Sequence, residues 1–201
     1  MRAYFINLAH RADRAAALGL DFSMAGLPWD LVRVEAVGGA AGRALSHAAA
    51  LEGFAGDERA GEYAAVMEDD FLFTRTRAYV ESVLGGALAL SPNVVCLGYR
   101  IPDSRSYVWA GENLLELRRA FRASCYVVRR GFARRLADVF RAAAAAGEPM
   151  DKAWQSLQGR GFYGVYPKAG IERVSFSDVE GRVSDRRARD ESVRAARRRM
   201  R

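Results

Sequence analysis

The sequence lacks the features of membrane-spanning, secreted and disulfide-rich proteins. No apolar run approaches the roughly 20 residues that a membrane-spanning helix requires. Residues 1–11 have neither the long apolar centre nor the small-residue cleavage site of a signal peptide. Only two cysteines occur, Cys96 and Cys125, and both lie in apolar stretches, which favours buried thiols over a disulfide framework or a zinc site. We therefore expect a cytoplasmic protein.

The excess of positive charge is confined to one end of the chain. Residues 186–201 contain eight arginines and two acidic residues, a net charge of +6 out of +7 for the whole sequence. The other 185 residues are therefore nearly neutral, at +1. We expect one domain over residues 1–185 and a basic tail over residues 186–201. A solvated chain end and a segment that binds an anionic membrane or nucleic acid both fit the tail.

Apolar periodicity alternates between the strand and helix patterns along the chain. It predicts strands at residues 2–8, 30–37, 62–67, 93–99 and 124–130, and helices at residues 10–26, 43–55, 77–90 and 131–147. Residues 100–122 fit irregular structure or a hairpin. Strands that alternate with helices predict an α/β sandwich with a mostly parallel central sheet.

Three consecutive acidic residues, Glu68, Asp69 and Asp70, follow the predicted strand at residues 62–67. Ligands of such sheets collect beyond the carboxyl ends of the strands. Because side chains alternate along an extended chain, Glu68 and Asp70 should share one face and Asp69 should take the other. Two carboxylates on one face suit a divalent cation with oxygen ligands. Alternatively, the three acids precede a helix, whose N-terminus favours acidic residues. We favour the metal, with Asp70 as the direct ligand and Glu68 as a ligand through water or a contact of the ribose.

Five short motifs occur in order along the chain. They are Ile6-Asn7-Leu8 with Arg11 and Arg14, Gly42 with Ser46-His47, Glu68-Asp69-Asp70, residues 124–136, and Pro149-Met150-Asp151. The ordered set, which spans residues 3–180, resembles glycosyltransferase family 25, a family that includes lipooligosaccharide and collagen galactosyltransferases. The sequence departs from that pattern in having no histidine after His47, so the late histidine that binds metal in some enzymes of this fold class has no counterpart.

The resemblance implies a fold and an activity. The fold would be a GT-A-like nucleotide-sugar-binding sandwich. The activity would be metal-dependent inverting transfer of a hexose, galactose from UDP-galactose, to a hydroxyl of a glycan or glycolipid acceptor, as in lipopolysaccharide biosynthesis. Manganese is the expected metal, and the basic tail is a candidate for peripheral contact with an anionic membrane. No specific nucleic acid is expected.

The resemblance also assigns roles to individual residues. Asn7, at the end of the first strand, would fix the turn into the helix or contact the base. Arg11 and Arg14 lie just after that strand, where arginines can bind phosphate, although solvated positions in a first helical turn fit either one equally well. Ser46 and His47 would belong to the donor pocket, against the alternative of a packed, hydrogen-bonded histidine. They do not form a nucleophile–base pair, because adjacent helical residues point about 100° apart.

Glu68 and Asp69 complete the donor-binding set, with Asp69 orienting its neighbours. Asp151 lies at a predicted helix start, where a capping carboxylate is the simple explanation. The resemblance makes it the candidate base that takes the proton of the attacking hydroxyl in an inverting transfer.

Two other classes of function compete with this one. A nucleotidyltransferase on a similar sheet would release pyrophosphate from a nucleoside triphosphate, whereas a glycosyltransferase releases a nucleoside diphosphate. A non-enzymatic module that binds anionic lipid or nucleic acid would depend on residues 186–201 and not on the acidic triplet.

Overall fold

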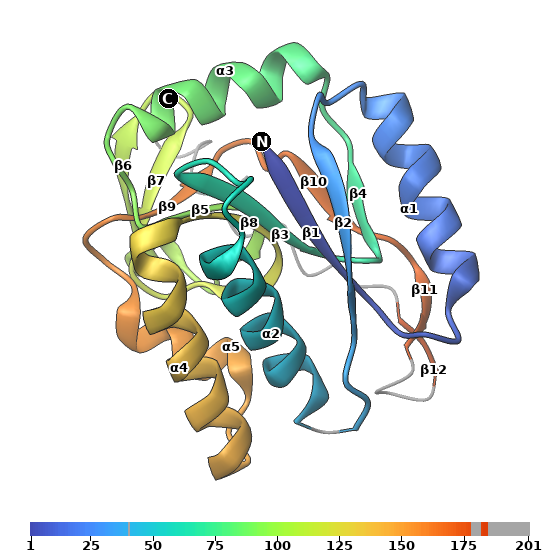
Figure 1. Cartoon of the computed structure of the whole chain (residues 1–201). Coiled ribbons are helices and arrows are strands. Elements are labelled where there is room, and N and C mark those ends of the chain that lie inside the picture. The colour runs from blue at the N-terminus through green and yellow to red at the C-terminus, as the bar shows by residue number, and fades with distance from the viewer. Residues whose placement is uncertain (40, 178–181, 185–201) are drawn as a thin grey trace.

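The structure, a computed structural model, describes residues 1–39, 41–177 and 182–184, the short strands β11 (Ser175–Ser177) and β12 (Arg182–Ser184) by their backbone alone. Within these residues an eight-stranded sheet has the order β2-β1-β3-β8-β5-β9-β7-β6 (Figure 1). Its strands are β1 (Arg2–Asn7), β2 (Asp30–Glu35), β3 (Tyr63–Glu68), β5 (Val94–Arg100), β6 (Tyr107–Gly111), β7 (Leu114–Leu117), β8 (Phe121–Arg129) and β9 (Phe162–Val165). The basic tail lies outside the described residues.

Most strands of this sheet run in one direction. β1 pairs in parallel with β2 and β3, β5 pairs in parallel with β9, and β8 lies between β3 and β5, antiparallel to both. β7 is antiparallel to β9 and β6, so six of the eight described strands share a direction and β7 and β8 oppose them. The predicted α/β sandwich with a mostly parallel sheet is therefore confirmed, and the hairpin predicted within residues 100–122 is formed by β6 and β7.

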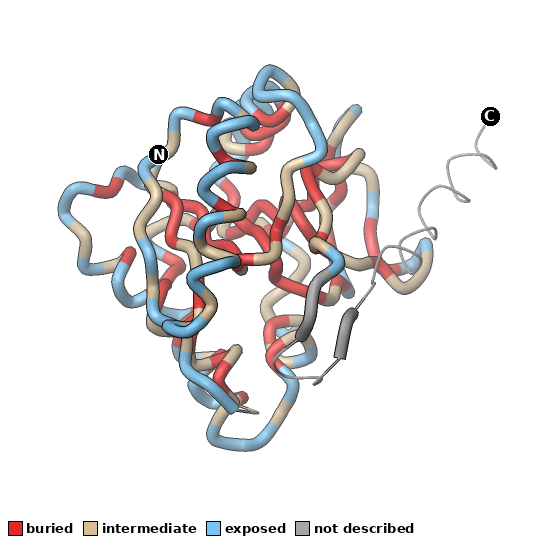
Figure 2. Tube along the Cα trace, turned by 90° about the vertical axis from the view of Figure 1, so that its right-hand side faces the viewer, coloured by how far each residue is buried: buried red, intermediate tan, exposed pale blue. Residues whose placement is uncertain are grey.

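Helices cover both faces of the sheet. They are α1 (Ala12–Ala25), α2 (Gly42–Gly56), α3 (Arg77–Leu88), α4 (Arg130–Ala146) and the short α5 (Met150–Ala153) with the 3-10 turn Trp154–Leu157. Side chains of α1 and α3 pack in one core cluster, and those of α2, α4 and α5 pack in another. Figure 1 shows where these helices lie around the sheet. Figure 2 shows the buried residues gathered between these layers.

The helices predicted at residues 10–26 and 131–147 both end at the glycines expected from the sequence. Gly26 after α1 and Gly147 after α4 both have left-handed φ angles, of 64° and 65°. A residue without a Cβ adopts that conformation without steric cost, so the chain leaves the helix there.

The alternation of β3 decides which side chains reach which helices. Ala64 and Val66 belong to the cluster beneath α2 and α4, and Ala65 and Met67 belong to the cluster beneath α1 and α3. Glu68, the next residue on the first of these faces, therefore points toward α2.

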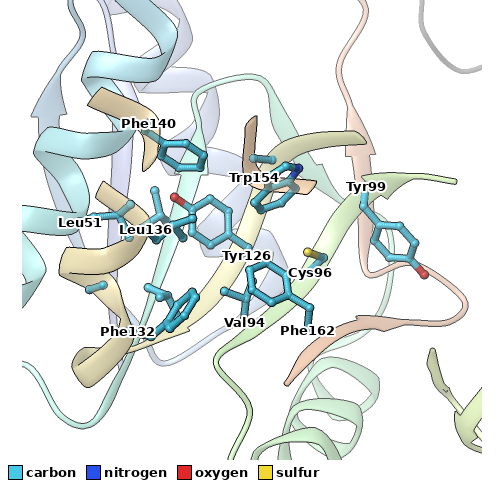
Figure 3. Close-up of a cluster of buried hydrophobic side chains, with 14 of the residues drawn as sticks. Leu51, Val94, Cys96, Tyr99, Tyr126, Phe132, Leu136, Phe140, Trp154 and Phe162 are labelled. Carbon is cyan, nitrogen blue, oxygen red and sulfur yellow. The ribbon is translucent and has the colours of Figure 1, made fainter. Parts of the chain in front are cut away.

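Aromatic side chains fill the core between the sheet and α4. The rings of Tyr126, Phe140, Trp154 and Phe162 pack together there, as Figure 3 shows. Trp154 is fully buried, and its indole Nε1 donates to the carbonyl oxygen of Ala120 at 3.3 Å. This anchors the segment that carries Asp151 to the sheet.

Cys96 and Cys125 are buried free thiols, as the sequence predicted. Burial in the apolar core raises the pKa of both thiols, so they remain protonated and inert. Among the described residues, every helix is too short or too polar to traverse a bilayer.

Gly98 of β5 makes a close contact that tests the packing. A Cβ at this position would lie 2.5 Å from a ring carbon of Phe71 and 2.6 Å from the Ser124 hydroxyl oxygen. We expect Gly98→Ala to lower the free energy of unfolding by about 1–3 kcal/mol, because the core must shift to admit a methyl group. Gly86→Ala in α3, where no atom lies within 4 Å, is the matched control and should be neutral or stabilising in urea unfolding. Equal destabilisation by both changes would contradict the packing argument.

Candidate active site

Charged side chains from several elements meet at the edge where β1 and β3 end. β1 ends at Asn7 and β3 ends at Glu68. Asp69 and Asp70 form the turn into β4 (Phe71–Phe73), which pairs with β10 (Gly170–Glu172). Because β8 runs in the opposite direction, its first residues lie at this edge as well. The acidic triplet is therefore placed where parallel α/β sheets bind their ligands.

Asp69 links β3 to β1 and α1. Its Oδ2 accepts from Asn7 Nδ2 at 2.7 Å, and its Oδ1 accepts from Arg14 Nη1 at 2.9 Å. Asn7 Nδ2 also donates to the carbonyl oxygen of Arg11. Burial raises the pKa of Asp69, while the bonds from Asn7 and Arg14 act in the opposite direction. Asp69 therefore holds the start of α1 against the strand end.

Glu68 points to the other face and binds α2. Its Oε1 lies 2.5 Å from Arg43 Nε and 3.1 Å from His47 Nε2. Burial opposes ionisation of Glu68, but Arg43 and His47 overcome it and lower its pKa to about 2. Glu68 and Asp69 thus take opposite faces, as the alternation predicted.

His47 is a packed, hydrogen-bonded histidine. It is fully buried, and its Nδ1 lies 3.1 Å from the Tyr126 hydroxyl. Burial lowers the pKa of His47, so the ring is neutral near pH 7. The ionised Glu68 can only accept, so Nε2 carries the proton and Nδ1 accepts from Tyr126. His47 therefore orients Glu68 from beneath the site.

Asp151 reaches this cluster through Arg43. Arg43 Nη1 donates to Asp151 Oδ1 at 3.0 Å, so one guanidinium contacts both Glu68 and Asp151. Asp151 lies in the first turn of α5, which is capped by Pro149 without a side-chain hydrogen bond. Asp151 is therefore an acid in the first turn and not the N-cap residue of this helix, and its carboxylate is paired with Arg43.

Asp70 is the acid of the triplet whose ionisation is most strongly opposed. Burial, followed by the charges of Glu68, Glu172 and Asp69, raises the pKa of Asp70 to about 8. Its Oδ1 is buried and has no hydrogen-bond partner within the described part of the chain. Glu172 lies 3.6 Å from Arg122, a buried arginine with a left-handed φ of 65°. Such strain in a non-glycine residue is typical of functional positions.

The cluster contains more negative than positive charge. Among the described residues that form it, the five carboxylates of Glu68, Asp69, Asp70, Asp151 and Glu172 face the three guanidiniums of Arg14, Arg43 and Arg122. With His47 neutral, these described side chains sum to −2 when all five acids are ionised, a state that the raised pKa of Asp70 opposes below about pH 8 unless a cation is bound. A divalent cation would balance this charge.

The available carboxylate oxygens fit a cation that is also coordinated by water and by substrate oxygens. Within the described ranges, no group of three or more His, Cys, Asp or Glu side chains could hold a metal ion as a protein cage. Asp70, with its unpartnered buried oxygen, fits as a single direct carboxylate ligand, which is a common arrangement for cations that also bind substrate phosphates. Glu68 Oε1 already has two partners, which favours a contact through water.

The remaining predicted residues lie near the cluster without all entering it. Arg11 forms an ion pair with Asp13 in the first turn of α1. Ser46 is buried, donates to the carbonyl oxygen of Gly42 at 2.6 Å and accepts from the Val37 amide at 2.8 Å. Ser46 thus fixes the loop between β2 and α2 through backbone groups of that loop and of α2.

Four residues of the cluster were not predicted: Arg43, Arg122, Tyr126 and Glu172. Arg43 carried a usable signal, since it precedes His47 by one helical turn and adjacent turns share a face. Glu172 and Arg122 carried none, because the approach of Glu172 to Asp70 and of Arg122 to Glu172 depends on pairing between distant strands.

Comparison with known proteins supports the fold. The galactosyltransferase LgtC, solved in complex with donor and acceptor sugar analogues, superposes with a TM-score of 0.53 over 90% of this chain and 91% of that one, at 9% identity. This shows the GT-A-like fold that the sequence predicted. The glycosyltransferase GlyE of Streptococcus pneumoniae gives a TM-score of 0.45 at 11% identity, over 82% of this chain and 45% of that one. A Drosophila β1,4-galactosyltransferase 7, in complex with manganese, UDP-Gal and xylobiose, gives 0.39 at 12% identity over 94% and 74%.

No protein-family model and no curated protein sequence matches the chain. The resemblance to glycosyltransferase family 25 therefore remains a prediction from the sequence motifs.

Proposed function

We propose that the protein is a metal-dependent glycosyltransferase that moves a hexose, galactose in the first instance, from a UDP-sugar to a hydroxyl of a glycan or glycolipid. The observation that supports this most is the acidic cluster at the end of β3, in which acids outnumber arginines and one buried oxygen of Asp70 has no hydrogen-bond partner among the described residues. In a GT-A-like fold this is the edge at which a nucleotide sugar would bind.

Asp70 would hold the divalent cation, for which manganese is our choice, and Glu68 would contact it through water. When bound, the cation supplies Lewis-acid stabilisation of the diphosphate that leaves the sugar. Asn7, Asp69 and Arg14 would shape the donor side, because their hydrogen bonds fix the strand end and the start of α1.

Of the other donor-side residues, one would contact the nucleotide directly and two would act through other residues. Arg11, at the start of α1, is the candidate for direct contact with phosphate. Ser46 and His47 would act indirectly, since Ser46 fixes the loop before α2 and His47 orients Glu68.

Asp151 would act as the general base. The acceptor oxygen forms a bond to the anomeric carbon, the bond from that carbon to the phosphate oxygen breaks, and the hydroxyl proton passes to the Asp151 carboxylate. Attack from the face opposite the leaving diphosphate inverts the anomeric centre. The side chain of Asp151 is 25% exposed, so an acceptor hydroxyl can approach it.

The test is turnover of a panel of nucleotide sugars with manganese and simple glycoside acceptors, with the released nucleotide identified. We expect release of UDP, fastest from UDP-galactose, and loss of turnover in excess chelator. Release of pyrophosphate from nucleoside triphosphates would instead support a nucleotidyltransferase, and full activity in chelator would contradict the metal role.

The basic tail gives a separate prediction. Its net charge of +6 would attract an anionic cytoplasmic membrane by about 1 kcal/mol per arginine near the surface, over a Debye length of about 8 Å at physiological salt. We expect truncation after Asp185 to lower binding to phosphatidylserine vesicles in sedimentation while leaving transfer to a small soluble acceptor unchanged. Binding by the full chain should weaken as salt rises. Equal vesicle binding by the full-length and truncated proteins would contradict the membrane role. Tight, sequence-selective nucleic-acid binding by the full chain that is lost on truncation would favour the non-enzymatic alternative.

A further inference from the structure

Arg43 is the charged residue at the centre of the site that the proposed mechanism does not yet use. Its Nε and Nη1 atoms contact Glu68 of β3 and Asp151 of α5, two acids that the sequence places far apart. A single rigid guanidinium therefore connects the end of the site that would bind the donor to the residue that would receive the acceptor proton.

The position of Arg43 is fixed by its own helix. It occupies the first turn of α2, one turn before the buried His47, and both side chains meet the same oxygen of Glu68. Gly42 allows this turn to pack closely, since a Cβ there would lie 2.0 Å from the carbonyl oxygen of Val37. The base of the Arg43 side chain is therefore held by the fold and not by the charges it binds.

The core holds helix α5 in place, whereas an ion pair holds the carboxylate of Asp151. Met150 and Trp154 anchor the α5 segment in the core, with 5% and 0% exposure. The Asp151 carboxylate makes no capping bond, and its ion pair is with Arg43. Loss of Arg43 would therefore release the carboxylate while leaving its helix in place.

We propose that Arg43 is a positioning residue for the transfer reaction, and that it sets the place of the Asp151 carboxylate relative to Glu68. This inference rests on the proposed function of the site. An arginine is required because its planar fork can bind two carboxylates in fixed directions, whereas a lysine ammonium is a point charge on a flexible stem. A displacement of about 1 Å in a reacting group can cost a factor of about 100 in rate.

The experiment compares the wild type with Arg43→Lys, Arg43→Ala, Asp151→Asn and the double variant Arg43→Ala/Asp151→Asn. We expect both Arg43 variants to lose about 100-fold or more in kcat for transfer. Arg43→Ala should cause little further loss in the Asp151→Asn background, because its effect is exerted through Asp151. Millimolar methylguanidinium should restore part of the kcat of Arg43→Ala and none of that of the double variant.

Arg141→Ala is the matched control, because Arg141 also pairs with a glutamate of α2, Glu52, but on the surface. It should retain wild-type kcat and show no response to methylguanidinium. Near-ultraviolet circular dichroism checks folding. If Arg43→Ala does not fold, Arg43→Lys, which keeps a charge beside Glu68, carries the test.

Different outcomes would contradict the positioning role of Arg43 and the proposed glycosyltransferase function. An active wild type whose Arg43→Lys variant keeps full kcat would overturn the positioning role alone. So would losses from Arg43→Ala and Asp151→Asn that simply multiply. A wild type that neither binds UDP in calorimetry nor turns over any donor would overturn the proposed function, and the role of Arg43 with it.

Discussion

Replacing Asp70 with asparagine is expected to abolish manganese-dependent turnover and, at the same time, to stabilise the metal-free protein. Burial, followed by repulsion from Glu68, Glu172 and Asp69, raises the pKa of this carboxyl to about 8. An amide of the same shape removes the repulsion, but it is a poor ligand for a divalent cation. The two effects have opposite signs, which distinguishes this residue from one that matters only for folding.

The stabilisation should depend on pH in a defined direction. The folded pKa of Asp70 lies above the usual value of an aspartate, 3.8, so the folded state binds the proton more tightly than the unfolded state. The contribution of Asp70 to the stability of the wild type therefore falls as pH rises from about 4 to about 8, by at most about 1.4 kcal/mol per pH unit. We expect Asp70→Asn to exceed the wild type by a few kcal/mol in urea unfolding at pH 8 without metal, and by little at pH 4.

Manganese supplies the second measurement. It should raise the melting temperature of the wild type, as any ligand of the folded state does, and should not raise that of Asp70→Asn. Asp103→Asn is the control, because Asp103 is paired with Arg119 and its pKa is lowered, so its loss should destabilise. An Asp70→Asn protein that keeps its manganese response and its turnover would remove Asp70 from the metal site.

The four long helices and five strands of the central sheet could be predicted because their signals are local, whereas the short strands β4, β9 and β10 were not predicted. The end of α1 at Gly26 and the end of α4 at Gly147 follow from glycine in the left-handed conformation, and apolar periodicity set the other boundaries within a few residues. The alternation along β3 likewise predicted that Glu68 and Asp69 take opposite faces, and Glu68 pairs with Arg43 while Asp69 pairs with Arg14. These outcomes depend on neighbours in the sequence.

The direction of β8 and the network around Arg43 could not be predicted in the same way. β8 enters between β3 and β5 because the chain returns through the β6–β7 hairpin and not through a helix, and an antiparallel partner follows from that route. The contacts of Arg43 with Glu68 and Asp151 form only when α2, the sheet and α5 are assembled. Periodicity holds no information about such contacts.

Asp151→Asn is expected to reduce the kcat of transfer by a factor of about 100 to 10,000, the usual contribution of a general base. UDP affinity, measured by calorimetry with manganese present, should stay within about threefold of the wild type, because the base acts on the acceptor hydroxyl and not on the donor phosphates. The fold should survive, since α5 is anchored by Trp154 and Asp151 makes no capping bond.

The control for this change is Asp138→Asn, on the exposed side of α4, which should leave kcat and UDP affinity unchanged. A fall in UDP affinity in step with the rate would place Asp151 in the nucleotide or metal site instead. Unchanged rate and affinity would leave Asp151 with only its ion pair to Arg43. The base role requires the rate alone to fall, because an asparagine amide preserves the shape of the side chain but cannot accept the proton of the attacking hydroxyl.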